Sequence, residues 1–208
     1  MAARRITAML LLPALLTACA GQGEQRADPG SGPPRTTAGP APSADPTDAA
    51  WVQLMIPMDE QALALLDLAA RKATDARLRS WAAGLRTAQA AELDALRGLR
   101  KRMGLPDTDL HEGHDMPGMV TAEDLARARA AEGTAFDALL VTGIHGHLRQ
   151  SEQVSRSERA AGGEAEARER ARALVAARGK QLAALTALCA GRAADVPEPF
   201  ACPSDHPV

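Results

Sequence analysis

The chain has 208 residues, and its 24 Lys and Arg against 26 Asp and Glu give a formal net charge of −2. That balance argues against a nucleic-acid-binding protein, which would need a clustered basic patch. Alanine, leucine, arginine and glutamate dominate, there is no tyrosine and β-branched residues are sparse, so the composition predicts an all-α protein.

The N-terminus has the pattern of an export signal. Two basic residues, Arg4 and Arg5, precede an apolar segment over residues 6–16. This segment is shorter than the roughly 20 apolar residues that a membrane-spanning helix needs. We therefore expect a processed signal rather than a transmembrane anchor.

The four residues that end this signal, Leu16-Thr17-Ala18-Cys19, are typical of a bacterial lipobox, in which the cysteine thiol is lipidated. We expect residues 1–18 to be removed as a lipoprotein signal peptide. The mature protein would then be extracytoplasmic, and the lipid on Cys19 would anchor it to the bacterial cell membrane. The alternative is an ordinary secretory signal that is cleaved near Ala18 or Ala20.

Composition divides the rest of the chain into three parts. Residues 19–47 are rich in Gly, Pro, Ser, Thr and Ala, cannot bury a core and should form a flexible tether. Residues 48–191 are long enough for one folded domain, and residues 192–208 form a C-terminal tail. Outside the cytoplasm we expect a disulfide between Cys189 and Cys202 that holds this tail to the last helix. A pair of soft metal ligands is the alternative.

Capping residues and glycines delimit four long helices and one short connector. We expect them at about residues 48–72, 74–104, 121–133, 134–162 and 164–190. Thr134, with Asp137 three residues later, resembles a capping box at the start of the fourth of these helices. Four long helices predict a four-helix bundle.

The second helix has a regular apolar stripe that a carboxylate interrupts. Leu78 and Leu85 share one heptad position, and Glu92 occupies the same position two heptads from the first of them. A carboxylate in an apolar interior costs free energy unless it is paired, protonated or bound to a metal. On the first helix the inward stripe contains Met55 and Met58, which are core packing or soft metal ligands.

The two halves of the domain show a faint repeat, over about residues 48–103 and 134–190. A shift of 89 residues places Met58 on His147 and Glu92 on Gln181. In that register His147 faces the bundle interior, whereas His145 lies near its rim.

The loop between the halves, His111-Glu112-Gly113-His114-Asp115-Met116-Pro117-Gly118-Met119, combines imidazole, thioether and carboxylate groups. Thioether sulfur binds Cu(I) well and hard cations poorly, while imidazole suits copper in both oxidation states. The loop therefore indicates copper. The alternative is a polar connection whose methionines pack on the fold.

Three segments carry a resemblance to a known family: Leu54-Met55-Ile56-Pro57 with Glu60-Gln61-Ala62, Ala88-Gln89-Ala90-Ala91-Glu92-Leu93, and His111 to Met119 with Phe136-Asp137. Over about residues 50–190 the chain resembles the exported ferritin-like family known as domain of unknown function 305. The resemblance implies a ferritin-like bundle of two helical-hairpin repeats. It also implies metal ligands in a Met-Ile-Pro-His-His segment of each repeat and a Gln-x-x-Glu segment of each partner helix. Some members are associated with copper.

The chain departs from that family pattern at its ligand positions. The departures are Met58-Asp59 and His147-Leu148 in place of the two His pairs, and Arg178 with Gln181 in place of the second Gln and Glu. Glu92 and His147 alone match the family ligands. Met58 is able to replace a histidine if the metal is Cu(I).

The sequence leaves two main hypotheses. The first is an envelope lipoprotein that binds copper or a related transition metal for metal handling or tolerance, with candidate ligands His111, His114, Met116, Met119, Met55, Met58, Glu92 and His147. The second is a structural or interaction lipoprotein without metal, in which Glu92 needs a buried protein partner such as His147. We do not expect an enzyme, because a ferritin-like oxidase needs Glu-x-x-His pairs and the sequence has none.

Overall fold

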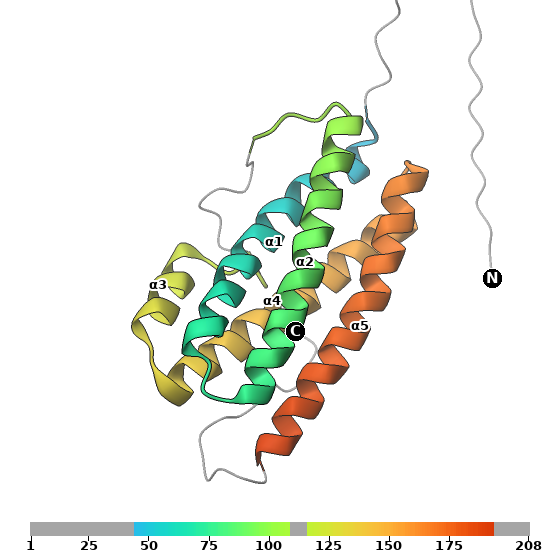
Figure 1. Cartoon of the computed structure of the whole chain (residues 1–208). Coiled ribbons are helices and arrows are strands. Elements are labelled where there is room, and N and C mark those ends of the chain that lie inside the picture. The colour runs from blue at the N-terminus through green and yellow to red at the C-terminus, as the bar shows by residue number, and fades with distance from the viewer. Residues whose placement is uncertain (1–43, 109–115, 194–208) are drawn as a thin grey trace, which may run out of the picture. The chain divides into compact units, whose positions relative to one another are not determined.

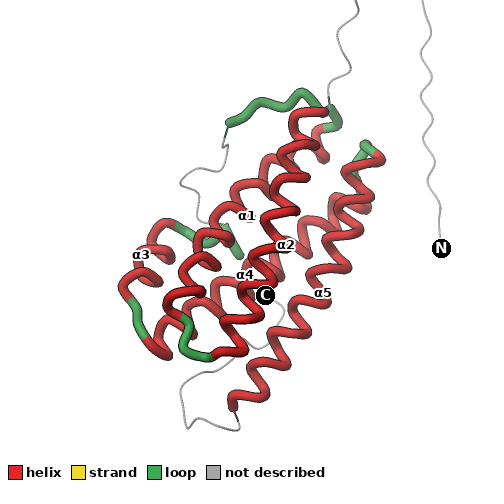
Figure 2. The backbone as a smooth tube through the Cα atoms, viewed as in Figure 1, coloured by secondary structure: helices red, strands yellow, loops and turns green. Residues whose placement is uncertain are grey.

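The computed structural model describes residues 44–108 and 116–193, and every structural statement below concerns these residues. They form five α-helices and no strand (Figure 2): α1 (Pro46–Lys72), α2 (Ala76–Arg102), α3 (Ala122–Ala130), α4 (Gly133–Ala161) and α5 (Ala165–Ala193). The prediction of an all-α bundle with one short connecting helix is confirmed. The predictions for Cys19, His111, His114 and Cys202, and for residues 19–43 of the tether, fall outside the described residues. Of the last tether residues, Asp45 caps α1 and Pro46 and Thr47 belong to it.

The four long helices pair as two helical hairpins, α1 with α2 and α4 with α5, and α1 also packs on α4 (Figure 1). Trp51, near the start of α1, donates from Nε1 to Ser155 Oγ near the end of α4, over 3.3 Å. Further along α1, Asp59 lies beside His147. The two helices therefore run antiparallel. Short α3 lies against both of them at the side of the bundle.

The starts of α2 and α3 agree with the predicted helix ranges to within two residues. Asp75 caps α2, and Thr121 starts α3 with a capping box that it completes with Asp124. The capping box predicted at Thr134 and Asp137 is wrong. Helix α4 begins one residue earlier, at Gly133, and its N-cap residue makes no side-chain hydrogen bond.

Asp137 instead joins the two hairpins. Its carboxylate accepts from the backbone N–H of Thr74, over 3.1 Å, and from the Thr74 hydroxyl, over 2.6 Å, just before α2 begins. Asp48 on α1 does the same for the other hairpin, because its Oδ2 accepts from Gly163 N (3.2 Å) and Glu164 N (2.7 Å) just before α5. Asp48 and Asp137 are 89 residues apart, and so are Thr74 and Gly163. Each hairpin thus supplies a carboxylate that accepts hydrogen bonds from the backbone just before the second helix of the other hairpin. The two interactions occupy equivalent positions in the internal repeat.

The buried apolar side chains form two clusters along the bundle. One contains apolar residues from Ala62 to Ala69 of α1 and from Leu78 to Leu85 of α2, and the other contains apolar residues from Trp51 to Ile56 of α1 and from Leu93 to Leu99 of α2. The segments between them, residues 57–61 and 86–92, carry buried polar groups. A polar layer therefore separates the two apolar clusters at the middle of the bundle.

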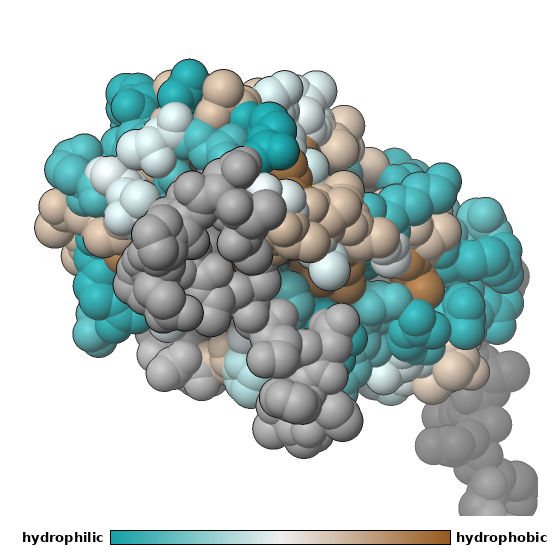
Figure 3. Space-filling view, turned by 90° about the horizontal axis from the view of Figure 1, so that it is seen from below, coloured by the Kyte–Doolittle hydropathy of each residue, from teal (hydrophilic) through white to brown (hydrophobic). Residues whose placement is uncertain are grey.

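The surface of the described residues carries many charged side chains. On the face shown in Figure 3, hydrophilic side chains alternate with weakly hydrophobic ones, and strongly hydrophobic residues form only small areas. Within the described ranges, no helix has the length and apolar character needed to cross a membrane.

Candidate functional site

A fully buried arginine, Arg178 of α5, is the centre of the polar layer. Its guanidinium holds the Glu92 carboxylate with two donors, Nη2 to Oε1 at 2.5 Å and Nη1 to Oε2 at 3.0 Å. Nε donates to Ser151 Oγ at 2.7 Å, and Nη1 also donates to Gln181 Oε1 at 3.1 Å. Bidentate pairing with a carboxylate uses the planar fork that only arginine has. Arg178 is thereby tied to α2 and α4 as well as to its own helix.

Asp59 and His147 form the other side of this layer, and both are fully buried. Asp59 Oδ1 lies 3.5 Å from Arg178 Nη2 and 3.5 Å from His147 Nε2. The buried Gln89 amide Nε2 lies 2.9 Å from the same imidazole nitrogen. If Gln89 donates, His147 carries its proton on Nδ1. Within the described part of the chain, neither His147 Nδ1 nor either Asp59 oxygen has a hydrogen-bond partner.

Burial and charge shift the protonation of both groups. Burial raises the pKa of Asp59 well above its usual value, and the neighbouring Glu92 carboxylate raises it further, while Arg178 opposes the shift. Burial lowers the pKa of His147 well below its usual value, and the Arg178 charge adds to this. The guanidinium and the Glu92 carboxylate are then the charged pair of the layer, next to a neutral imidazole.

This layer does not fit a bound metal ion. Arg178 directs three nitrogen donors at the carboxylates and the hydroxyl that surround it, so a positive charge already occupies the centre of the site. Across residues 44–108 and 116–193, no three His, Cys, Asp or Glu side chains are placed to share a metal. Glu92 therefore has the buried partner that a metal-free reading requires, and that partner is Arg178 rather than His147.

Four of the sequence-predicted ligands lie in the bundle. Met55 and Met58 are buried, and Met55 packs in the apolar cluster with Trp51. His147 is buried as expected and lies in the same polar layer as Glu92, but among the described residues no hydrogen bond or ion pair joins the two. Their roles as metal ligands stay predictions.

The sequence analysis gave no role in the site to Asp59, Gln89, Ser151 or Arg178. Asp59 directly follows the inward-facing Met58 and is fully buried as well. The repeat contained a usable signal, because a shift of 89 residues superposes Gln89 on Arg178. Two polar residues at equivalent places on partner helices indicate a polar layer, although not which groups pair.

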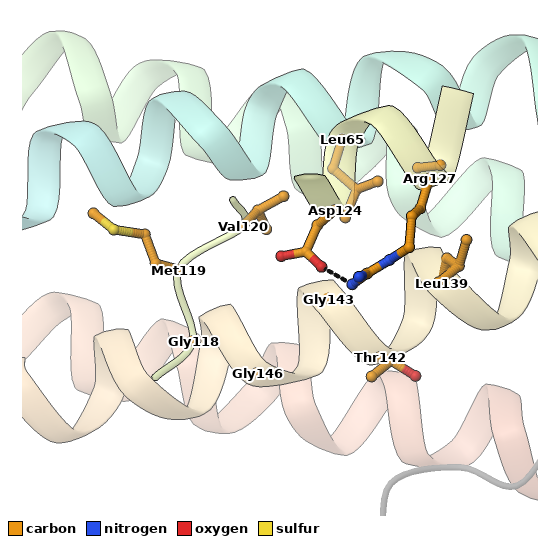
Figure 4. A pocket seen from close by; sticks show the side chains of 11 residues that line it. Leu65, Gly118, Met119, Val120, Asp124, Arg127, Leu139, Thr142, Gly143 and Gly146 are labelled. Atoms are coloured by element: carbon orange, nitrogen blue, oxygen red, sulfur yellow. Dashed lines mark hydrogen bonds and ion pairs between the residues drawn. The ribbon is translucent and has the colours of Figure 1, made fainter. Parts of the chain in front are cut away.

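The second half of the candidate loop packs on α4. Gly118 has φ +76, and a Cβ there would lie 2.6 Å from the carbonyl oxygen of Gly146. Met119 and Val120 are buried and Met116 is half-buried. Figure 4 shows the Met119 side chain extending toward α1, so this thioether is part of the packing.

A cavity of about 210 Å³ lies beside this segment, between α3 and α4 (Figure 4). Leu65, Val120 and Leu139 give it apolar walls, and the Asp124–Arg127 ion pair also lines it. Its only sulfur ligand is Met119, so its lining favours apolar contact over metal binding.

Two buried carboxyl groups meet where α1 begins and α4 ends. Asp48 is fully buried and Glu158 is 1% exposed. Among the described residues, Asp48 Oδ1 and both Glu158 carboxyl oxygens have no hydrogen-bond partner. Burial raises the pKa of Glu158 to about 8, with further contributions from Asp48 and Asp45, while Arg168 opposes the shift. Glu158 therefore favours its protonated form at neutral pH.

Cys189 on α5 is buried and disulfide-bonded. The other half of this bond lies outside the described residues, where both Cys19 and Cys202 are found. The pairing with Cys202 stays a prediction.

Known proteins resemble this chain over the same helical body. Residues 48–189 match the family model described as Domain of unknown function (DUF305). A DUF305 fragment from Deinococcus radiodurans has a similar structure, with a TM-score of 0.65 and 20% identity over 73% of this chain and 99% of that one.

A DUF305 protein from Streptomyces coelicolor, described as a candidate secreted protein, has a TM-score of 0.63 and 18% identity over 71% of this chain and 94% of that one. At these identities the two structures show the fold alone. A search of curated proteins found no match.

Proposed function

Because this chain belongs to the DUF305 family, we propose that it is an extracytoplasmic lipoprotein that binds copper(I) through its His-Met loop, residues 111–119, and not in the bundle interior. The bundle then acts as the rigid body that carries this loop. The role that we propose for this protein is metal handling or tolerance at the bacterial envelope.

The observation that carries this proposal is the pairing of Glu92 with Arg178. A buried carboxylate needs a compensating charge, a proton or a metal, and here a guanidinium supplies the charge through two hydrogen bonds. The charge of Glu92 is therefore compensated by a protein group, which supports a metal site elsewhere. The loop is then the remaining place where imidazole and thioether groups gather.

The packing of the loop narrows its ligand set. Met119 is buried against the bundle, whereas Met116 is half-buried and follows His114 by two residues. His111, His114 and Met116 are thus the side chains that we assign to the metal. Copper(I) accepts this combination of two imidazoles and one thioether.

The proposed location depends on the N-terminal sequence. The apolar segment and lipobox that end at Cys19 support export and lipid anchoring. The description of the Streptomyces coelicolor relative as a candidate secreted protein supports the same side of the membrane. Mass spectrometry of the mature N-terminus tests this, because a diacylated Cys19 is expected and an unmodified start near Ala20 would contradict it.

Anaerobic titration of the full chain in detergent with Cu(I) and a competing chelator tests the metal. We expect one copper per chain, lost in His111→Ala/His114→Ala/Met116→Ala. Met58→Leu is the matched control, because it removes an interior thioether of similar volume and should leave binding unchanged. Copper binding that survives the loop changes but fails in Met58→Leu would move the site into the bundle.

The second candidate function is a structural or interaction lipoprotein without a metal. Arg178 favours it, because its guanidinium, a protein group, compensates the Glu92 carboxylate. The absence of Cu(I) binding above chelator competition would support it. On either proposal the chain is not an enzyme, since the sequence has no Glu-x-x-His pair of the kind that a ferritin-like oxidase needs.

A further inference from the structure

We propose that the cavity between α3 and α4 binds a small uncharged molecule that has an apolar body, such as one aromatic ring, and a hydroxyl group. This site uses none of the side chains of the polar layer. It also does not depend on copper binding by the loop.

The walls of the cavity are apolar and come from α1, α3, α4 and the segment before α3 (Figure 4). The apolar side chains that line it are Leu65, Met119, Val120, Ala128 and Leu139. Its volume of about 210 Å³ exceeds the cavity of about 150 Å³ that accepts benzene in a helical protein interior. The cavity therefore has room for one aromatic ring and a small substituent.

Two glycines of α4, Gly143 and Gly146, form part of the cavity wall. Glycine inside a helix is less favourable than alanine, so each position calls for a reason. At Gly143 an added Cβ would lie 2.8 Å from Leu65 Cδ2, and packing therefore requires glycine there. At Gly146 the nearest atom to an added Cβ is Gly118 Cα, at the ordinary contact distance of 3.6 Å. Packing does not require a glycine at position 146, and its effect is to leave the cavity wider.

An ion pair gives the cavity a hydrogen-bond donor and an acceptor side by side. Arg127 of α3 pairs with Asp124 through Nη2, and Figure 4 shows this pair between α3 and α4. The Asp124 carboxylate is held in place separately, because its Oδ2 accepts from Thr121 N (2.9 Å) and Thr121 Oγ1 (2.8 Å). A hydroxyl group donates one hydrogen bond and accepts others, so it is able to contact both members of the pair.

The charges beside the cavity select against an anionic ligand. Arg127 also donates from Nη1 to Glu123 Oε1 over 3.0 Å, so one guanidinium serves two carboxylates. A ligand carboxylate would compete with both of them and would be repelled by both. The arrangement therefore favours a hydroxyl group over a carboxylate on the same apolar body.

Titration of the full chain with phenol, followed by NMR of ¹³C-labelled methionine methyl groups, tests the proposal. The Met119 methyl resonance should shift and saturate, with a dissociation constant on the order of 1–10 mM for so small a ligand. Met55 and Met58 are buried but do not line the cavity, so their resonances should not move. Benzoate should bind about tenfold more weakly than phenol, because its carboxylate meets the two acidic groups.

Two pairs of variants locate the ligand. Gly146→Ala narrows the cavity and should weaken phenol binding at least about fivefold. Gly84→Ala is its matched control, because Gly84 is an exposed glycine within α2 with nothing near its Cβ position. Arg127→Ala should weaken phenol binding about 3–10-fold and leave toluene binding unchanged, since toluene has no hydroxyl group. Arg129→Ala, on the same helix and exposed, should change neither.

Several results would overturn the proposal. An unshifted Met119 resonance at saturating phenol would show that the cavity takes no such ligand, and benzoate binding as tight as phenol would contradict the uncharged class. Phenol binding that Gly146→Ala leaves unchanged would place the ligand elsewhere. Arg127 is 54% exposed, so Arg127→Ala should fold and decides the role of the ion pair even if Gly146→Ala is unstable. An equal loss of phenol and toluene binding in Arg127→Ala would contradict the contact with the hydroxyl group.

Discussion

At the scale of single residues, the choice of arginine at position 178 decides the chemistry of the interior. Lysine has no planar fork and cannot hold Glu92 with two parallel donors while a third reaches Ser151. The buried pair has lost its hydration, so its two members depend on each other. Removing one partner leaves an uncompensated charge, which is more costly than removing both.

This dependence predicts the stability of variants at the pair. Arg178→Met should lower the free energy of unfolding by about 3–5 kcal/mol, because Glu92 loses its counter-charge. Arg178→Met/Glu92→Met should recover most of that loss. Urea unfolding of the four chains in a double-mutant cycle measures the coupling.

The exposed Arg102–Glu166 pair is the control, since both side chains are about half exposed, at 54% and 46%. Arg102→Met should cost about 0–1 kcal/mol, as solvent already screens this pair. A cost for Arg178→Met as small as that of Arg102→Met would mean that the buried charges are compensated in another way.

At the scale of helices, the start of α1 and the end of α4 meet at two buried acidic side chains, Asp48 and Glu158. Asp48 also accepts from the backbone before α5, so the same carboxylate connects three helices. Asp45 and Arg168 are the other charged groups that face Glu158. Ionisation of Glu158 would place a second negative charge beside Asp48 and weaken this junction.

The sign of the pH dependence follows from the direction of the shift. The folded-state pKa of Glu158, about 8, lies above the ordinary value of 4.5, so its contribution to stability is complete below about pH 4.5. It is lost progressively as the pH rises toward and through about 8. Urea unfolding between about pH 5 and pH 9 should show a decline that is shallower in Glu158→Gln.

Glu164→Gln provides the comparison, because Glu164 is an exposed carboxylate in the short connection between α4 and α5. Its pH profile should match that of the unchanged chain. A Glu158→Gln profile that is as steep as the original would show that other groups cause the decline.

The segment before α3 depends on a glycine for its close approach to α4. At Gly118 an added Cβ would lie 2.3 Å from Gln150 Cβ, and the backbone has φ +76. Gly104 has a similar φ, +67, but nothing lies within 4 Å of its Cβ position. Gly104→Ala should therefore cost only the conformational strain, roughly 1–2 kcal/mol.

Gly118→Ala should cost about 1–3 kcal/mol more than Gly104→Ala, because α4 backbone cannot move aside as a flexible side chain would. Thermal or urea unfolding of the two variants gives this difference directly. Equal costs would mean that residues 116–120 are not packed on α4 as described.

At the scale of the whole molecule, the two hairpins form one body through α1 and α4. Asp48 of the first hairpin caps the turn of the second, and Asp137 of the second caps the turn of the first. The guanidinium of Arg178 also crosses from the second hairpin to Glu92 of the first. Neither hairpin contains all the partners that its buried polar groups need.

We therefore expect neither hairpin to fold alone. Peptides covering residues 44–108 and 116–193 should each show little helix by far-ultraviolet circular dichroism, since isolated helices are marginal in water. Mixing them should restore helicity, and Asp137→Ala in the second peptide should weaken the association. Full helicity of either peptide alone would contradict this dependence.

The helices and their boundaries were accessible from the sequence because they depend on local chemistry. The 3.6-residue period, the glycines and the caps at Asp75 and Thr121 act within a few residues of the chain. The wrong capping box at Thr134 shows the limit of that reasoning. Asp137 has the spacing of a capping-box residue, three positions after Thr134. In the folded chain, however, its carboxylate accepts a hydrogen bond from Thr74, which is 63 residues away.

The sequence by itself determined that the chain is an all-α bundle with polar groups in its interior, because periodicity identifies the buried face of each helix. It also identified Glu92 as a carboxylate on the inward stripe of its helix and His147 as an inward histidine. Only the tertiary structure decided that Arg178 neutralises Glu92, since the two residues are 86 positions apart on different helices. Periodicity gives the direction in which a side chain points, whereas its partner depends on how the helices pack against one another.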